Sequence, residues 1–136
     1  MVLAGGKSKV TVGFAAACLL LALFVLALTP GPAAARSFST SSSFGFFSGT
    51  PDAFLGEISS NNKPKCRKGR LVKVFRERGR RDTFIGRDRA SSTGQWIVEK
   101  TVPSGRYYAL IPKKRFGPNG RNNCRRYKST TLRFES

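Results

Sequence analysis

Short apolar runs separated by turn residues constrain this chain more than any other feature. They recur at roughly ten-residue spacing from residue 53 onward, and no window there shows helical periodicity over three turns. Val72 and Val74, for example, lie on one face of a two-residue period, as do Leu132 and Phe134. Short strands at this spacing are typical of two facing antiparallel sheets. We therefore predict an all-β fold, a small seven-stranded antiparallel β-sandwich spanning residues 53–136.

The predicted strands are the segments in which apolar residues alternate, and each is bounded by turn residues. They cover 54–58, 70–76, 83–87, 96–98, 107–111, 124–127 and 130–134. Phe84, in the third of them, is expected to point into the core. Residues 113–123 are rich in Gly, Pro and Asn as well as basic, so we expect them to form the longest loop.

The stretch from Gly94 to Pro112 holds the only Trp and two of the three Tyr. Trp96 shares one strand face with Val98, and Tyr107 begins a second alternating run. Pro103 lies in the segment between them, where its fixed φ favours a turn. We predict a hairpin here, with its aromatic side chains in the core rather than at a ligand site, because aromatic residues supply much of the core area.

The N-terminus has the order of parts of a secretory signal peptide, assigned to residues 1–35. Two lysines precede an uncharged apolar run at 13–28, and Ala33 to Ala35 offer small residues for cleavage. The alternative is an uncleaved anchor helix, although the run is shorter than the ~20 residues that span a bilayer. Cleavage removes Lys7 and Lys9 from 25 basic residues and keeps all seven acidic ones, which leaves a net charge of +16.

Residues 36–52 are dominated by Ser, Thr and Gly and predict a flexible linker. Its four phenylalanines are too sparse for a core of their own. Weak adhesion of these side chains to a surface is the alternative.

Two cysteines, Cys66 and Cys124, survive signal cleavage and bracket most of the β pattern. The exported context favours their oxidation, so we predict a structural disulfide between them. A redox pair and half of a metal site are the alternatives, but the chain has no Cys-x-x-Cys motif, no third exported Cys and no His.

The lack of His also excludes the Ser-His and Cys-His nucleophile systems. The seven carboxylates are scattered, and most adjoin Arg or Lys, which favours surface pairing. We therefore expect no catalytic residues, no metal site, no cofactor and no small-molecule substrate.

Several motifs resemble the carboxypeptidase regulatory-like, prealbumin-type modules of bacterial secreted proteins. They are the segments FLGEI at 54–58, GRLVKV at 69–74, TGQWIV at 93–98 and PSGRYYA at 103–109, together with Cys66 and the Ile85-Gly86 pair. The resemblance implies a seven-stranded sandwich in which the Gly-x-Tyr-Tyr-Ala pattern marks a turn and a strand start. It also implies a folding, adhesion or spacer unit rather than a catalyst. Some modules of this broad group bind calcium through acidic loops, whereas the loops here are basic.

Basic residues cluster in segments expected to be exposed turns, and Arg outnumbers Lys by fifteen to ten. Such a charge attracts polyanions whatever the fold, and Arg suits phosphate and carboxylate. The candidate binding residues are Arg76, Arg78, Arg80, Arg81, Lys113, Lys114, Arg115, Arg121, Arg125 and Arg126.

The expected partners follow from export to the cell surface or the medium. They are acidic cell-envelope polymers or an anionic membrane surface, with a membrane tether if the signal is not cleaved. A basic face that is merely solvated is one alternative. Nucleic-acid binding inside the cell is another, although no RNP, zinc-finger or helix-turn-helix signature supports it.

Overall fold

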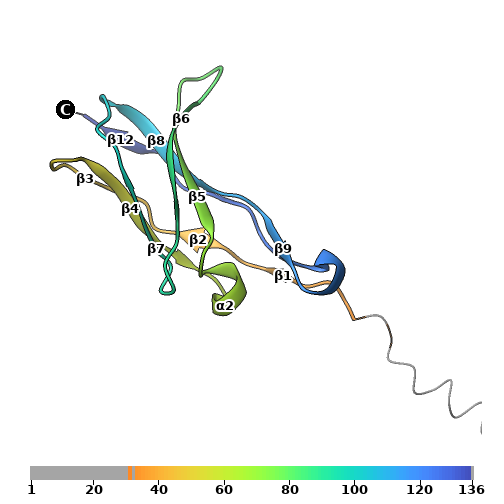
Figure 1. The fold of residues 1–136 in the computed structure, drawn as a ribbon. Helices are drawn as coiled ribbons and strands as arrows, with labels where there is room; N and C mark the ends of the chain where they lie inside the picture. Colours follow the sequence, from red (N-terminus) through yellow and green to blue (C-terminus); the bar gives the residue numbers. More distant parts are fainter. Residues whose placement is uncertain (1–30, 32, 136) are drawn as a thin grey trace, which may run out of the picture. The chain divides into compact units, whose positions relative to one another are not determined.

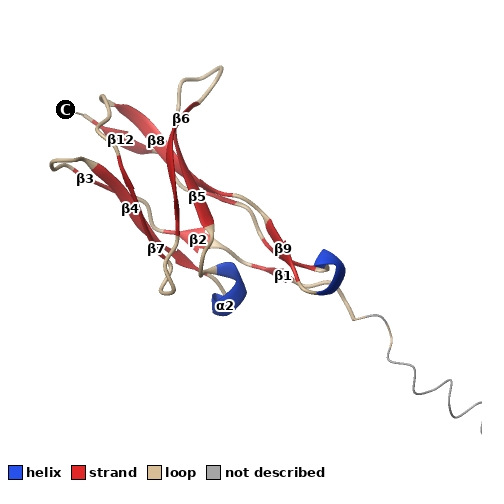
Figure 2. Ribbon diagram, viewed as in Figure 1, coloured by secondary structure: helices blue, strands red, loops and turns tan. Residues whose placement is uncertain are grey.

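The computed structural model describes residue 31 and residues 33–135, and the predicted signal peptide lies almost wholly outside them. The described part is an all-β domain with two short helical segments (Figures 1 and 2). Five strands have five or more residues: β4 (Ala53–Ser59), β5 (Leu71–Arg76), β6 (Thr83–Arg89), β7 (Gln95–Glu99) and β8 (Gly105–Ile111). The shorter strands are β1 (Ser37–Phe38), β2 (Ser41–Ser42), β3 (Gly45–Phe47), β9 (Lys114–Phe116), β10 (Asn122–Cys124), β11 (Tyr127–Lys128) and β12 (Leu132–Phe134). The helical segments are α2 (Lys63–Cys66) and the 3-10 turn η1 (Pro118–Gly120).

Two sheets contain the long strands. In the first, β4 pairs with β7 on one side and with β2 and β3 on the other. In the second, β5 lies between β6 and β8, and β8 also pairs with β11 and β12. All of these pairings are antiparallel.

The hydrophobic core takes side chains from both sheets. Phe54 and Ile58 of β4 and Val72 and Val74 of β5 have no exposed surface, and the rings of Phe54 and Tyr107 lie 5.0 Å apart between centroids. The remaining core members are Ala90, Trp96, Val98, Val102, Ala109 and Ile111. Alternation along β5, β7 and β8 thus produces the apolar faces that the sequence predicted.

Trp96 lies in the core, as predicted, with 3% of its surface exposed. Its indole N–H donates to Ser42 Oγ at 3.0 Å, and its ring stacks on Phe44 at 6.1 Å. Gly56 lies beneath the ring, where an added Cβ would come within 2.7 Å of the indole and 2.1 Å of the Ser43 carbonyl oxygen.

The predicted hairpin from Gly94 to Pro112 is wrong. Strand β7 pairs only with β4 among the described strands, whereas β8 pairs with β5, β11 and β12, so the connection at residues 100–104 crosses from one sheet to the other. Two apolar faces find a common interior equally well across facing sheets, and alternation cannot distinguish these arrangements. The Tyr107 hydroxyl donates to the Pro103 carbonyl and anchors the crossing.

The predicted linker at 36–52 instead carries β1, β2 and β3. Strands β2 and β3 pair with β4, and the alternating Phe44 and Phe46 pack against the core. The phenylalanines that looked too sparse for a core of their own complete a core built by other strands.

Phe84 does not point inward, since 52% of its surface is exposed. The pairing of β5 with β6 shifts register between Val74 and Phe75, so Phe75 lies opposite Phe84 and Ile85 is left over. Such a bulge changes which residues face inward, and here Ile85 packs against the core.

A three-stranded sheet pairs the first strand of the described domain with the segment between β8 and β11. Strand β10 pairs antiparallel with β9 and parallel with β1. Strands β9 and β10, joined through η1, occupy the segment expected to be one long loop. Asn119 and Gly120 both have positive φ within this connection, which explains how so irregular a sequence folds back.

Cys66 and Cys124 form the predicted disulfide, with a Cα–Cα distance of 5.4 Å. Both residues are fully buried. The bond joins α2 to β10 and so ties the three-stranded sheet to the segment that enters β5.

Candidate functional site: two basic clusters and a hollow

The first basic cluster, the turn cluster, consists of Arg78, Arg80 and Arg81 in the connection between β5 and β6. All three side chains are exposed. Gly79 adopts φ +81° at the bend, a conformation that favours glycine. The turn therefore presents three guanidinium groups to solvent within four residues.

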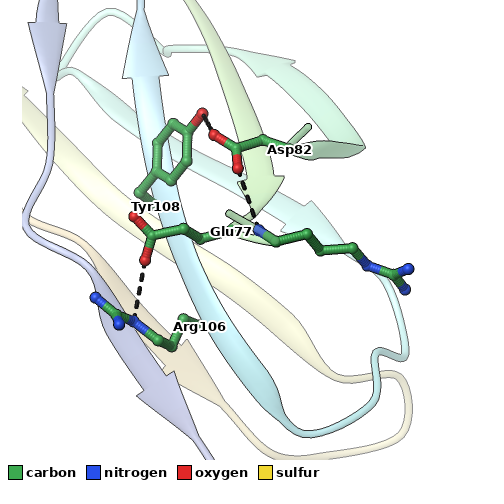
Figure 3. Close-up of polar contacts among 5 residues, drawn as sticks. Glu77, Asp82, Arg106 and Tyr108 are labelled. Atoms are coloured by element: carbon green, nitrogen blue, oxygen red, sulfur yellow. Dashed lines mark hydrogen bonds and ion pairs between the residues drawn. The ribbon is translucent and has the colours of Figure 1, made fainter. Parts of the chain in front are cut away.

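Asp82 holds this turn in place (Figure 3). Its carboxylate accepts the Arg78 backbone N–H at 3.2 Å and the Tyr108 hydroxyl at 2.7 Å. A second attachment follows at Glu77, whose carboxylate pairs with Arg106 Nε at 3.0 Å and whose N–H donates to the Arg106 carbonyl. The turn cluster is thus fixed to β8 by side chains as well as by backbone.

These contacts shift two pKa values in opposite directions. The hydrogen bond from Tyr108, followed by that from the Arg78 N–H, lowers the pKa of Asp82. Burial, followed by the contact with Asp82, raises the pKa of Tyr108 to about 12. The Tyr108 ring stacks on Phe75 at 5.5 Å and receives the Lys128 ammonium at 3.9 Å from its centroid. Tyr108 is therefore a structural anchor that stays protonated at neutral pH.

Arg76 was predicted as a binding residue but has a structural contact. Its guanidinium donates to the Ser104 carbonyl at 2.6 Å and lies over Gly105, where an added Cβ would come within 2.8 Å of Nε. It lies half-buried at the crossing between the sheets.

The second basic cluster, the hairpin cluster, surrounds β9 and β10. Its six members are Lys113, Lys114, Arg115, Arg121, Arg125 and Arg126, and all are exposed. Figure 1 shows the β5–β6 turn and the β9–η1 segment well apart on the domain. The structure therefore divides the predicted binding residues between two surfaces.

A third arrangement brings together cations that are distant in the sequence. A hollow of about 290 Å³ is lined by Gly69, Arg70, Leu71, Arg89, Pro112, Lys113 and Lys114. Leu71 and Arg89 are opposite each other in the β5–β6 pairing, residues 112–113 link β8 to β9, and Lys114 is the first residue of β9. Four of the lining residues are cationic and none is acidic.

Lys114 lies close to several other positive charges. Its ammonium donates to the Lys65 carbonyl at 3.1 Å. Burial, followed by the charges of Arg70, Lys65 and Arg89, lowers the pKa of this lysine. The hollow is therefore a region of concentrated positive potential.

Arg70 forms the buried base of this region, with 2% of its surface exposed. It donates to the Pro112 carbonyl at 2.6 Å, the Cys66 carbonyl at 3.2 Å, Thr40 Oγ1 at 3.3 Å and the Arg125 carbonyl at 3.4 Å. Desolvation by burial lowers the pKa of this arginine. Among the described residues no carboxylate lies within 4.0 Å of its guanidinium.

Sequence reasoning did not include Arg70 and Arg89 among the candidate binding residues. The predicted third strand stopped at residue 87, two residues short of β6, so nothing placed Arg89 opposite the start of β5. Extending the predicted third strand to residue 89 would have placed Arg89 opposite Leu71, and the sequence offered no other indication.

Two other kinds of site, a metal-ion cluster and a membrane-spanning helix, are absent from the described part of the chain. It contains no group of three or more Cys, Asp or Glu side chains placed to hold a metal ion. No helix in residues 33–135 is long and apolar enough to cross a membrane, and the candidate anchor run at 13–28 lies outside those residues. Comparison of the chain with protein-family models, curated proteins and solved structures finds no match.

Proposed function

We propose that this protein is an exported, non-catalytic β-sandwich module of the prealbumin-like kind that binds acidic polymers of the cell envelope through charge. An anionic membrane surface would meet the same clusters. The observation that carries this proposal is the uncompensated charge of the exposed turns, where the turn cluster offers three guanidinium groups on a segment that Asp82 holds in place.

The balance of charge supports the proposal. The seven carboxylates cannot neutralise the 23 basic residues of the exported chain. Among the described residues two ion pairs form, Arg106 with Glu77 and Arg133 with Glu135, and neither uses a member of the turn cluster. A field of this size raises the local concentration of polyanions and weakens as salt screens it.

The disulfide supports export, because such bonds persist in oxidising compartments. An intracellular nucleic-acid-binding protein would be expected to keep these thiols reduced. We therefore retain the secreted or cell-surface location as part of the proposal.

The test measures affinity for three unrelated polyanions, one phosphate-rich, one carboxylate-rich and one DNA duplex, as a function of salt. The expected result is a fall of orders of magnitude between low and physiological salt, by comparable factors for all three. A dissociation constant unmoved by salt, or no binding to anionic envelope material at low ionic strength, would refute the proposal.

Variants then locate the contact. Replacing Arg78, Arg80 and Arg81 together by Ser should weaken binding and reduce the salt slope by about two to three, because each lost phosphate contact removes ~0.7–0.9. The matched control replaces three exposed cations outside both clusters, Lys68, Arg87 and Lys100, by Ser. Equal losses in the two triple variants would mean that total charge, not the turn cluster, sets the affinity.

A further inference from the structure

The hollow shares Lys113 and Lys114 with the hairpin cluster, but it is concave, and the side chains of Arg70, Arg89 and Lys114 are held in position. Arg89 donates to the Gly69 carbonyl at 3.2 Å, and Lys114 donates to the Lys65 carbonyl. Arg70 is held by four oxygen acceptors. Because these long basic side chains are already ordered, binding of a ligand here would cost little side-chain conformational entropy.

The four cations come from three separate segments of the chain. Arg70 immediately precedes β5, Arg89 ends β6, Lys113 lies in the link between β8 and β9, and Lys114 begins β9. A group with oxygens on several sides matches such an arrangement better than a planar carboxylate with two. A phosphate group also carries about −1.5 to −2 charges at neutral pH, against one for a carboxylate.

The volume and charge of the hollow set further limits on the ligand. About 290 Å³ is just below the usual ~300–1,000 Å³ range for ligand sites, which suits a compact group and a short part of the molecule that carries it. No lining residue is acidic, so no carboxylate of the wall competes with an anion. Burial and neighbouring cations lower the pKa of Lys114, and an anion in the hollow would relieve both the repulsion and the uncompensated charge of Arg70.

We propose that this hollow is a binding subsite for a phosphate group, with Arg89, Lys113 and Lys114 as its contacts and Arg70 as a buried charge beneath them. The proposal rests on the charge-driven binding proposed above and adds a site selective for one chemical class. The shared chemistry fits two sources, free inorganic phosphate and a phosphate carried on an envelope polymer.

The first experiment titrates the purified, oxidised protein with inorganic phosphate at constant ionic strength, by replacing chloride, and follows backbone amide resonances. Saturable shifts are expected at residues 69–71 and 113–114. Acetate at the same ionic strength is expected to bind at least tenfold more weakly. Shifts that grow linearly and appear equally at the turn cluster would overturn the subsite, as would equal affinity for acetate.

Variants test the named contacts. Arg89→Gln and Lys114→Gln keep much of the side-chain length and a donor but remove the charge, and each should weaken phosphate binding about tenfold. Lys100→Gln, which removes an exposed cation outside both clusters and the hollow, is the matched control and should leave phosphate binding unchanged. Amide spectra without phosphate establish that each variant is folded. Folded Arg89→Gln and Lys114→Gln variants that bind phosphate as the wild type does would refute the assignment.

The last arm identifies the source and separates this proposal from the proposed function. If polymer-borne phosphate is the ligand, Arg89→Gln should weaken binding to a phosphate-rich polymer more than to a carboxylate-rich polymer of equal charge density. If the two polymers are affected equally while inorganic phosphate binding is lost, free phosphate is the ligand. If the wild-type protein binds inorganic phosphate saturably but binds no acidic polymer, the proposed function alone is contradicted. If it binds acidic polymers but shows no saturable binding of inorganic phosphate, the subsite alone is contradicted.

Discussion

Replacing Arg70 by Met tests whether a buried cation can stabilise this domain without a carboxylate partner. The side chain connects four segments through its acceptors: Thr40 before β2, Cys66 in α2, Pro112 after β8 and Arg125 after β10. Met keeps much of the bulk and removes both the charge and the donors.

Two opposing effects decide the magnitude. The two shorter bonds, to the carbonyl oxygens of Pro112 and Cys66, contribute ~1.5–3 kcal/mol each because the donor is charged, or roughly 3–6 kcal/mol together. Removing a buried charge recovers part of this, since desolvation of an ion costs several kcal/mol. We expect the loss of the hydrogen bonds to the two carbonyl oxygens to outweigh the relief of charge burial, with a net loss of about 3 kcal/mol in the free energy of unfolding. That is a large share of the ~5–15 kcal/mol typical of a single domain.

Urea denaturation followed by far-UV circular dichroism, with the disulfide intact, measures this loss at an unchanged m-value. In Arg70, Nη1 donates to Thr40 and Cys66, and Nη2 donates to Pro112 and Arg125. Arg70→Lys should lose about half as much stability as the Met variant, because a single ammonium keeps the charge and a donor but cannot reach both pairs of acceptors. A Met variant as stable as the wild type, or more stable, would show that burial of the charge outweighs its hydrogen bonds and would refute the reasoning.

Three further predictions concern the disulfide, the core and alkaline pH. Replacing Cys66 and Cys124 together by Ser should lower the free energy of unfolding by about 4 kcal/mol, because the disulfide joins residues 58 apart in the sequence. Urea titration of the oxidised wild type and of the Ser variant checks this, and equal midpoints would contradict it. The buried Trp96 of the wild type is expected to emit at short wavelength and to resist quenching by acrylamide. Gly56→Ala should displace the ring, shift this emission to the red and make it accessible to acrylamide; an unchanged spectrum in a folded variant would contradict the packing. The pKa of Tyr108 is raised to about 12 from near 10 in the unfolded chain, so its contribution to stability is complete below pH 10 and is lost as the pH rises from about 10 through 12. Urea midpoints across that range should fall further for the wild type than for Tyr108→Phe, and parallel curves would contradict the assignment.

The core strands were predictable from sequence because alternation is a local property. The apolar runs around Phe54, Val72 and Tyr107 became β4, β5 and β8, and Cys66 and Cys124 were the two cysteines that remain outside the predicted signal peptide. The partner of each strand was not predictable in this way, since alternation states which side chains face inward and not which strand lies alongside. The hairpin between β7 and β8 failed for that reason.

In the candidate site, too, features set by neighbouring residues were predictable and features set by strand pairing were not. Local clustering located the exposed arginines of the turn cluster, whose placement depends on one connection. The hollow depends on the register of β5 with β6 and on the end of β8, three segments that no local pattern relates. The sequence placed Arg70 only as the first residue of the predicted strand 70–76, and its burial is visible only after the chain has folded around it.

The parallel pairing of β1 with β10 has a mechanical consequence. The Arg36 and Phe38 carbonyls accept the N–H groups of Asn123 and Arg125 at 2.9 Å each, and the Phe38 ring stacks on Phe116. A pull on Arg36 along the strand loads these two bonds together, in shear, instead of opening them one after the other. Cys124, the register partner of Phe38, passes the load through its covalent bond to α2, so tension that enters at β1 is shared with the interior before any long strand has to separate.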